Sequence, residues 1–99
     1  MFYLVGSRFF GTHREDSDWD YLGEDTPENR KLCEVLGLKQ IPANPQLTRY
    51  WNNGIDICLV SNLERSIRAR DIAAAMPDIK ELTKAERHQR IREIIHGLG

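Results

Sequence analysis

The chain has 99 residues, of which 40% are hydrophobic and 29% are charged, and its formal net charge is −1. This length and composition are those of one small globular domain, which excludes a fibrous or largely disordered chain. No apolar run approaches the roughly 18 residues needed to cross a bilayer. The N-terminus also lacks the basic region and cleavage site of a signal peptide, so we expect a cytoplasmic protein with no membrane association.

Charged residues are unevenly distributed along the chain. Residues 1–60 hold six Lys and Arg against nine Asp and Glu, whereas residues 61–99 hold eight against six. We interpret the basic excess of residues 61–99 as a solvated helix face; the alternative is a surface that binds an acidic partner or nucleic acid.

Cys33 and Cys58 lie in apolar stretches and are expected to be buried free thiols in a reducing compartment. The Cys and His residues show no metal-ligand spacing.

Strand and helix patterns alternate along the chain. Thr26 is expected to cap a helix that has Pro27 at its first position and ends at Gly37. The loop that follows, 38–46, contains two prolines. The elements predicted are strand 2–6, a short helix or turn 7–12, strand 18–22, helix 27–37, strands 47–51 and 55–60, helix 62–75 and a last helix at about 80–97. The order favours a single α/β-type (α+β) domain, 1–99, with a small mixed sheet and helices packed on it.

Two capping boxes are predicted near the C-terminus. Ser61 with Glu64 would start one helix, and Thr83 with Glu86 would start the last helix near residue 83 instead of 80. That helix carries an apolar stripe at helical spacing. Its members are Leu82, Ala85, His88, Ile91, Ile94, Ile95 and Leu98. We expect it to pack on the domain's own sheet, with His88 partly buried; the alternative is docking to a partner subunit or a second copy of the chain.

Two carboxylates, Asp18 and Asp20, stand at alternate positions of a predicted strand. Side chains alternate along a strand, so these two share one face and Trp19 and Tyr21 point to the other. Adjacent carboxylates repel one another, and Mg²⁺, which takes carboxylate and phosphate oxygens, would remove that repulsion. An acidic surface strand is the structural alternative.

A Gly-Ser turn precedes the two carboxylates. Gly6 permits backbone conformations that a side chain would block and allows a ligand to approach closely. A turn that follows a strand and opens a helix can present N–H groups to an anion, and Ser7 adds a hydroxyl donor. An ordinary strand-to-helix turn has the same sequence features.

A third acid, Asp56, interrupts an otherwise apolar strand, Ile55 to Val60, which follows a predicted tight turn, Asn52-Asn53-Gly54. A carboxylate among apolar residues needs a partner. Asp56 either pairs with an arginine, or it meets Asp18 and Asp20 on an adjacent strand and completes a metal site. An Asp56 that faced away from the other two, or paired with an arginine instead, would end the enzymatic interpretation.

These features together resemble the minimal nucleotidyltransferases of the DNA polymerase beta-like superfamily, whose signature is Gly-Ser, ten residues, then Asp-x-Asp. Gly6, Ser7, Asp18 and Asp20 match it, and Asp56 stands where the family has its third acid. The resemblance covers roughly residues 1–75. The chain departs from the family in lacking a helix before the first strand and in its charged insert, 13–16.

The resemblance implies a Mg²⁺-dependent enzyme that moves a nucleoside monophosphate, AMP from ATP by expectation, onto a hydroxyl and releases pyrophosphate. Asp18, Asp20 and Asp56 would hold two Mg²⁺ ions about 3.5–4 Å apart, and Asp56 could take the acceptor proton. Gly6 and Ser7 would bind the nucleotide phosphates. Arg8 or Arg14 would neutralise charge on them.

The acceptor is left open by the sequence. Relatives of this type include toxin–antitoxin components that modify proteins, and others that modify tRNA ends, so we expect a macromolecular acceptor, protein or tRNA. Two alternatives remain. One is a non-catalytic nucleotide- or protein-binding module that acts as an inhibitor or regulatory subunit. The other is a nucleic-acid binder that uses arginines of the C-terminal third, namely Arg65, Arg68, Arg70, Arg87, Arg90 and Arg92.

Overall fold

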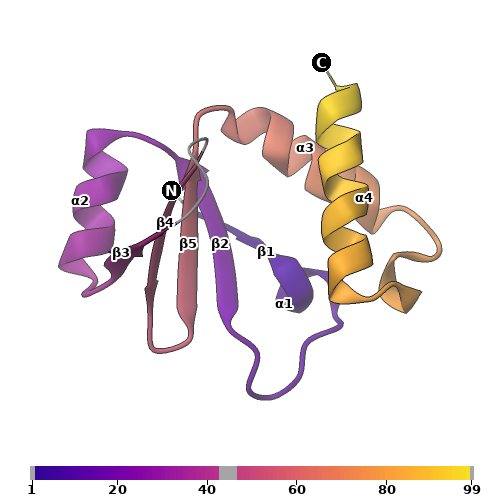
Figure 1. The fold of residues 1–99 in the computed structure, drawn as a ribbon, viewed down its shortest axis with the longest axis horizontal. Helices are drawn as coiled ribbons and strands as arrows, with labels where there is room; N and C mark the ends of the chain where they lie inside the picture. Colours follow the sequence, from indigo (N-terminus) through magenta and orange to yellow (C-terminus); the bar gives the residue numbers. More distant parts are fainter. Residues whose placement is uncertain (1, 43–46, 99) are drawn as a thin grey trace.

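Five strands form one mixed sheet in the computed structural model, which describes residues 2–42 and 47–98. The strands are β1 (Tyr3–Val5), β2 (Trp19–Glu24), β3 (Lys39–Ile41), β4 (Leu47–Asn52) and β5 (Ile55–Val60), in the spatial order β1-β2-β5-β4-β3. Only β2 and β5 pair in parallel, and the other neighbours are antiparallel. The mixed α+β architecture predicted from the sequence is therefore confirmed (Figure 1).

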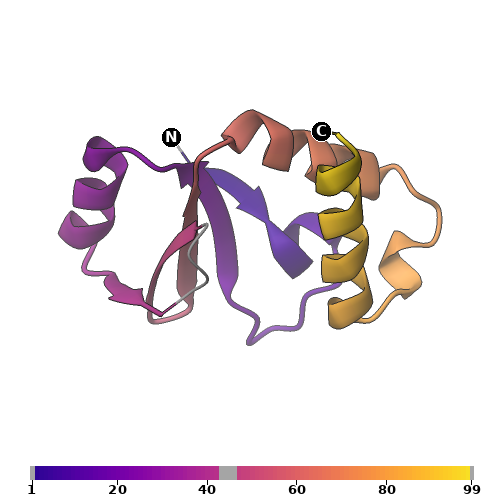
Figure 2. The same ribbon diagram turned by 45° about the horizontal axis from the view of Figure 1, so that its top comes forward.

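The helices lie on both sides of this sheet. Helix α2 (Pro27–Val35) stands on one side, and α1 (Gly6–Phe10), α3 (Leu63–Ala74) and α4 (Lys84–Gly97) gather on the other, as Figures 1 and 2 both show. A short 3-10 turn, η1 (Ile79–Glu81), joins α3 to α4. None of the helices in the described part of the chain is long and apolar enough to cross a membrane.

The β4–β5 hairpin is built as the sequence predicts. Asn53 and Gly54 have φ values of 47° and 82°, the two left-handed positions that a two-residue hairpin turn requires. The turn fixes the register, so that Asn52 pairs with Ile55 and Trp51 with Asp56. The predicted loop 38–46 is wrong in part, because residues 39–41 pair with β4 as an edge strand; residues 43–46 lie outside the described residues.

The apolar core is divided into two clusters. Cys33, Leu38, Tyr50, Ile57 and Leu59 are buried between α2 and its face of the sheet. Burying a side chain such as Leu59 completely is worth about 2–3 kcal/mol. The second cluster joins α1, α3 and η1 through Phe10, Ala73 and Ile79. No disulfide contributes, because Cys33 and Cys58 are both free thiols, the first buried and the second half-buried.

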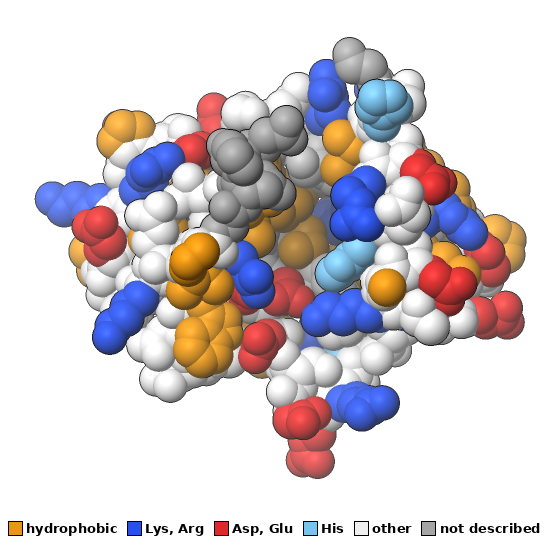
Figure 3. Space-filling view, viewed as in Figure 1, with side chains coloured by type: hydrophobic (Ala, Val, Ile, Leu, Met, Phe, Trp, Pro, Cys, Tyr) orange, Lys and Arg blue, Asp and Glu red, His pale blue; other side chains and the backbone are white. Residues whose placement is uncertain are grey.

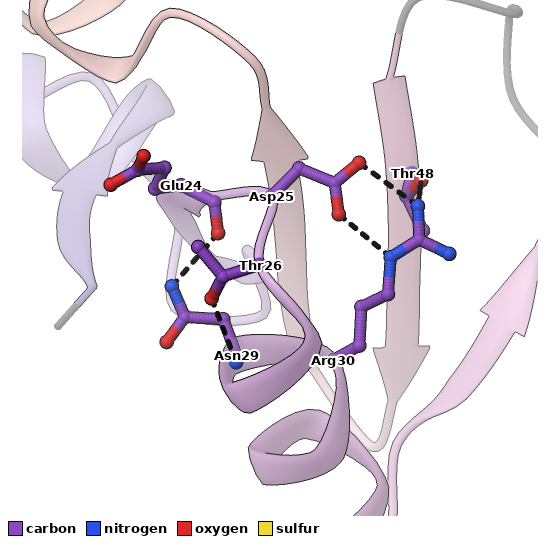
Figure 4. Close-up of polar contacts among 6 residues, drawn as sticks. All are labelled: Glu24, Asp25, Thr26, Asn29, Arg30 and Thr48. Carbon is purple, nitrogen blue, oxygen red and sulfur yellow. Dashed lines mark hydrogen bonds and ion pairs between the residues drawn. The ribbon is translucent and has the colours of Figure 1, made fainter.

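Helix α2 is attached to the sheet by polar contacts at its start (Figure 4). The Thr26 hydroxyl accepts the backbone N–H of Asn29 at 3.1 Å, which confirms the predicted N-cap. The guanidinium of Arg30 pairs with Asp25 at 2.7 Å and also donates to the hydroxyl of Thr48 on β4 at 3.0 Å. This end of α2 is thereby held close to the sheet, whereas at its other end Cys33 is buried and Val35 is exposed.

The helices α3 and α4 begin later than the predicted residues 62 and 80. Asn62, not Ser61, caps α3, because its side-chain oxygen accepts the N–H of Arg65 at 3.1 Å. The last helix starts at Lys84 and not at about 80, because Thr83 and Glu86 form the alternative capping box, with both reciprocal hydrogen bonds present.

Helix α4 packs against helices and not against the sheet. Ile91 and Ile94 lie on the cluster formed by α1, α3 and η1, so the apolar stripe is covered within the chain. Ala85 and His88 are exposed members of the stripe, although partial loss of water contact at His88 lowers the pKa of its imidazole. Buried Arg87 lies on the packed side instead, where its guanidinium donates to the carbonyl oxygen of Leu82 at 2.7 Å.

Thr83 and Ser61 each begin a predicted capping box, but only Thr83 caps a helix in the structure. Thr83→Ala removes the hydroxyl that accepts the Glu86 N–H, so we expect the free energy of unfolding to fall by about 1 kcal/mol. Ser61→Ala, the matched control, is expected to change it by less than about 0.5 kcal/mol, because Asn62 supplies the cap. Urea unfolding of both variants measures this; equal losses would contradict the assignment.

Candidate active site

The parallel pairing of β2 and β5 brings two predicted acids together. Asp20 and Asp56 are register partners, so their side chains leave the same face of the sheet from neighbouring strands. Asp18 lies just before β2, and its Oδ2 accepts the indole N–H of Trp51 at 3.3 Å. Trp51 is itself the register partner of Asp56 on β4. The three acids of the sequence motif therefore gather at one end of β2 and β5, on the face away from α2.

Gly6 contacts the carboxylate of Asp20 directly. A Cβ placed on Gly6 would lie 2.4 Å from Asp20 Oδ2, closer than a side chain allows, and the backbone of Gly6 has a φ of +73°. β1 and β2 are antiparallel, with Val5 opposite Asp20, so the chain leaves β1 beside the acid and turns at once into α1. The Gly-Ser turn and the Asp-x-Asp motif, separated by a loop in sequence, form one site.

Asp56 is both beside Asp20 and paired with an arginine. Arg49 Nε lies 3.0 Å from Asp56 Oδ1 and 2.9 Å from Oδ2, and its Nη2 also contacts Oδ2. The Asp56 side chain is 6% exposed and that of Arg49 is 42% exposed. Of the two findings named above as ending the enzymatic interpretation, the arginine partner is therefore present, and a side chain turned away from Asp20 is not. The buried carboxylate is neutralised by Arg49.

Asp20 lacks such a partner. Within residues 2–42 and 47–98, no hydrogen bond or ion pair to its carboxylate is found. Burial raises the pKa of Asp20, and the charges of Asp56 and Asp18 raise it further. The positive charges of Lys84 and Arg49 act in the opposite direction on that pKa. A partly buried carboxylate that is repelled by two others is the kind of group that a bound cation stabilises.

Arg8 has a structural role that the sequence analysis does not anticipate. Its guanidinium donates to the carbonyl oxygen of Ser17 at 3.0 and 3.2 Å and to that of Glu15 at 3.2 Å. The same group lies 4.2 Å from the centre of the Trp19 ring. These contacts hold the loop that leads into Asp18, so in this conformation Arg8 is engaged there. Arg14 is exposed in that loop.

A hollow separates this face of the sheet from α4. Figure 3 shows acidic side chains at its sheet side, with Lys or Arg and His side chains along its α4 side. Lys84 lies at the first turn of α4, close enough for its charge to lower the pKa of Asp20. Arg49, Trp51 and Lys84 are the site residues that the sequence analysis missed. The hairpin register could have identified the first two, whereas nothing local in the sequence links Lys84 to the site.

Cys58 adds no nucleophile to the site. It lies two residues beyond Asp56 on the same face, with its Sγ 4.0 Å from Asp56 Oδ1. Burial, and then the charge of Asp56, raise the pKa of Cys58 to about 11. The thiol is therefore protonated at neutral pH, and thiolate chemistry is disfavoured.

The donor set suits a hard divalent cation, although it is not arranged as a finished metal site. Asp18 and Asp20 offer carboxylate oxygens, the ligands that Mg²⁺ prefers. In the described part of the chain, no three His, Cys, Asp or Glu side chains form a group that could hold a metal ion. Both carboxylate oxygens of Asp56 accept hydrogen bonds from Arg49, so Asp18 and Asp20 are the acids of the motif that are not paired with an arginine among the described residues.

No protein-family model, curated protein or solved structure was found to match this chain.

The contact between Gly6 and Asp20 predicts strong energetic coupling. Gly6→Ala is expected to destabilise the fold by about 1–3 kcal/mol more than Gly37→Ala, because overpacking adds to the left-handed strain. Gly37 is the matched control, since its φ is +81° and no atom lies within 4 Å of a Cβ placed there. In an Asp20→Ala background, most of the extra cost should disappear. A double-mutant cycle by chemical unfolding measures this, and strictly additive effects would contradict the contact.

The raised pKa of Asp20 predicts an unusual pH dependence in metal-free protein. Its ionisation is harder in the folded state, so the native state binds the extra proton and stability falls as pH rises above the ordinary value of 3.8. Asp20→Asn should therefore unfold at a higher temperature than wild type at pH 7, and this advantage should vanish on acidification to about that ordinary value. Thermal unfolding in EDTA across pH gives the measurement; a gain that grows on acidification would contradict it.

Proposed function

We propose that the protein is a Mg²⁺-dependent nucleotidyltransferase that transfers a nucleoside monophosphate, AMP from ATP by preference, to a hydroxyl of a macromolecular acceptor. The observation that carries the proposal is the contact between Gly6 and the Asp20 carboxylate, with Asp56 as the register partner of Asp20. It joins a turn suited to phosphate to a group of acids suited to magnesium, as the resemblance to the minimal nucleotidyltransferases requires.

Each residue of the site has a distinct role in the proposed reaction. Asp18 and Asp20 hold the divalent cation, and Trp51 orients Asp18 through its indole N–H. Mg²⁺ bound there supplies charge neutralisation for the triphosphate and lowers the pKa of the attacking hydroxyl. Gly6 lets the backbone of the turn lie against Asp20, beside the cation that Asp20 would hold, and Ser7 would donate its hydroxyl to a phosphate bound there. Asp56 lies beside Asp20, where a carboxylate can accept the proton of the acceptor hydroxyl.

The Arg49–Asp56 pair restricts this proposal. Asp56 can act as a base or ligand only if Arg49 releases it, because both carboxylate oxygens are occupied. The Arg49 side chain is 42% exposed, so it has room to move towards solvent. An arriving triphosphate would attract the guanidinium, since arginine binds phosphate as readily as carboxylate. Nucleotide binding then frees Asp56 at the moment when a base is needed.

Transfer of label from α-labelled ATP tests the proposal. Wild-type protein, incubated with Mg²⁺ and a cell lysate, should label a component of the protein or RNA fraction. Asp18→Asn with Asp20→Asn should abolish the labelling without lowering the unfolding temperature, because these carboxylates repel one another in the metal-free protein. Glu15→Gln with Asp16→Asn, two exposed acids of the preceding loop, is the matched control and should label normally. Full labelling by the first double variant would refute the proposal.

Asp56→Asn distinguishes this enzyme from the competing candidate, a non-catalytic nucleotide- or protein-binding module. The arginine partner of Asp56 is the observation that favours the module, because it gives Asp56 a purely structural role. If Asp56 is catalytic, Asp56→Asn loses labelling while calorimetry still detects ATP binding in Mg²⁺. In the module, Asp18→Asn and Asp56→Asn would leave partner binding unchanged, and no variant or wild type would transfer label.

A further inference from the structure

Three side chains form a row along one side of α4, and the first of them, Lys84, lies close enough to Asp20 to lower the pKa of that acid. Lys84, His88 and Arg92 are spaced four residues apart, so they lie along one side of the helix over about 12 Å. All three are exposed. Figure 3 shows Lys or Arg and His side chains on the α4 side of the hollow.

The cations of this row are not used to hold the fold. The other arginines of α4 and one of α3 are: Arg87 donates to Leu82, Arg90 pairs with Asp78 at 3.1 Å, and Arg70 donates to the carbonyl of Leu4 at 2.8 Å. Neither Lys84 nor Arg92 has a salt bridge to any residue of 2–42 or 47–98, although Arg92 donates to Gln89. Partial loss of water contact lowers the pKa of His88, and the charges of Lys84 and Arg92 lower it further.

An exposed aromatic ring lies on the same face of the sheet as the acids. Trp51 is 40% exposed and stands beside Asp56 on the same face of the sheet, with its N–H fixed by Asp18. A ring that is held at its polar edge presents its face to a ligand without further ordering. Nucleic-acid bases stack on such rings whatever their sequence.

We propose that the hollow between α4 and the sheet binds single-stranded nucleic acid, with phosphates along Lys84, His88 and Arg92 and a base on Trp51. The nucleic acid would be the acceptor of the transferred nucleotide; that last step rests on the proposed function, whereas the binding itself does not. A row of about 12 Å is longer than one triphosphate, so it suits a succession of phosphates. An acidic protein segment would satisfy the cations but would give Trp51 no planar ring to stack upon.

Fluorescence anisotropy of labelled oligonucleotides tests the binding. RNA and DNA strands of about ten nucleotides, without secondary structure, are titrated in EDTA so that no transfer takes place. Lys84→Glu with Arg92→Glu should weaken binding by at least about tenfold at low salt, and the slope of log K against log salt should shrink by about 1.4. Lys31→Glu with Lys39→Glu makes the same charge change at exposed positions of α2 and β3, and should weaken binding less than about threefold.

Tryptophan emission locates the bound strand. Saturating oligonucleotide should quench Trp19→Phe, which retains Trp51, and should leave Trp51→Phe, which retains Trp19 on the opposite face of β2, nearly unquenched. The proposal is overturned if no strand binds below about 100 µM, if the two charge-reversal variants lose affinity equally, or if only Trp19 is quenched. It is also overturned if polyglutamate binds and the oligonucleotides do not.

The outcome is independent of that of the labelling assay. Label found in the protein fraction together with no oligonucleotide binding would overturn this inference and leave the nucleotidyltransferase standing. Oligonucleotide binding without any transfer of label would refute the enzyme and support the nucleic-acid site.

Discussion

The site depends on one constraint, the contact between the backbone of Gly6 and the carboxylate of Asp20. A side chain at that position would be strained, because φ is +73° and a Cβ would lie 2.4 Å from Asp20 Oδ2 unless that carboxylate shifted. The contact sets where the chain leaves β1, how α1 begins, and how closely the Gly-Ser turn approaches the acids. The parallel pairing of β2 with β5 then places Asp56 beside Asp20.

The balance of charge at this end of the sheet also shapes the site. The three carboxylates at this end of the sheet are neutralised unequally. Asp56 pairs with Arg49, and Asp18 accepts the indole N–H of Trp51. Among the described residues, Asp20 has only the more distant positive charges of Lys84 and Arg49. A group that carries an uncompensated charge in a half-buried position is unfavourable for stability and useful for binding a cation. The proposed chemistry uses Asp20, the acid of the three for which residues 2–42 and 47–98 supply no hydrogen-bond or ion-pair partner.

The two helical layers have different tasks. Helix α2 covers one face of the sheet with apolar side chains and makes the larger buried cluster. On the other side, α1 and α3 hold α4 away from the sheet by packing on its Ile91 and Ile94. The sheet face that bears the acids is consequently opposite the cationic side of α4 and not beneath an apolar one. This separation creates the hollow in which both proposals place their ligands (Figure 3).

The sequence by itself determined the elements whose cause is local. The N-cap at Thr26, the Asn53-Gly54 turn and the Thr83–Glu86 capping box each depend on neighbouring residues, and the structure confirms them. Alternation along a strand suggests Asp18 and Asp20 as a pair, whereas Asp56 is added through the resemblance to the minimal nucleotidyltransferases. Tertiary structure alone decided that Arg49 occupies Asp56, that Arg8 holds a loop, that residues 39–41 join the sheet, and that α4 faces the site with Lys84. Those outcomes are set by strand register and helix packing, which bring together residues that no spacing rule connects.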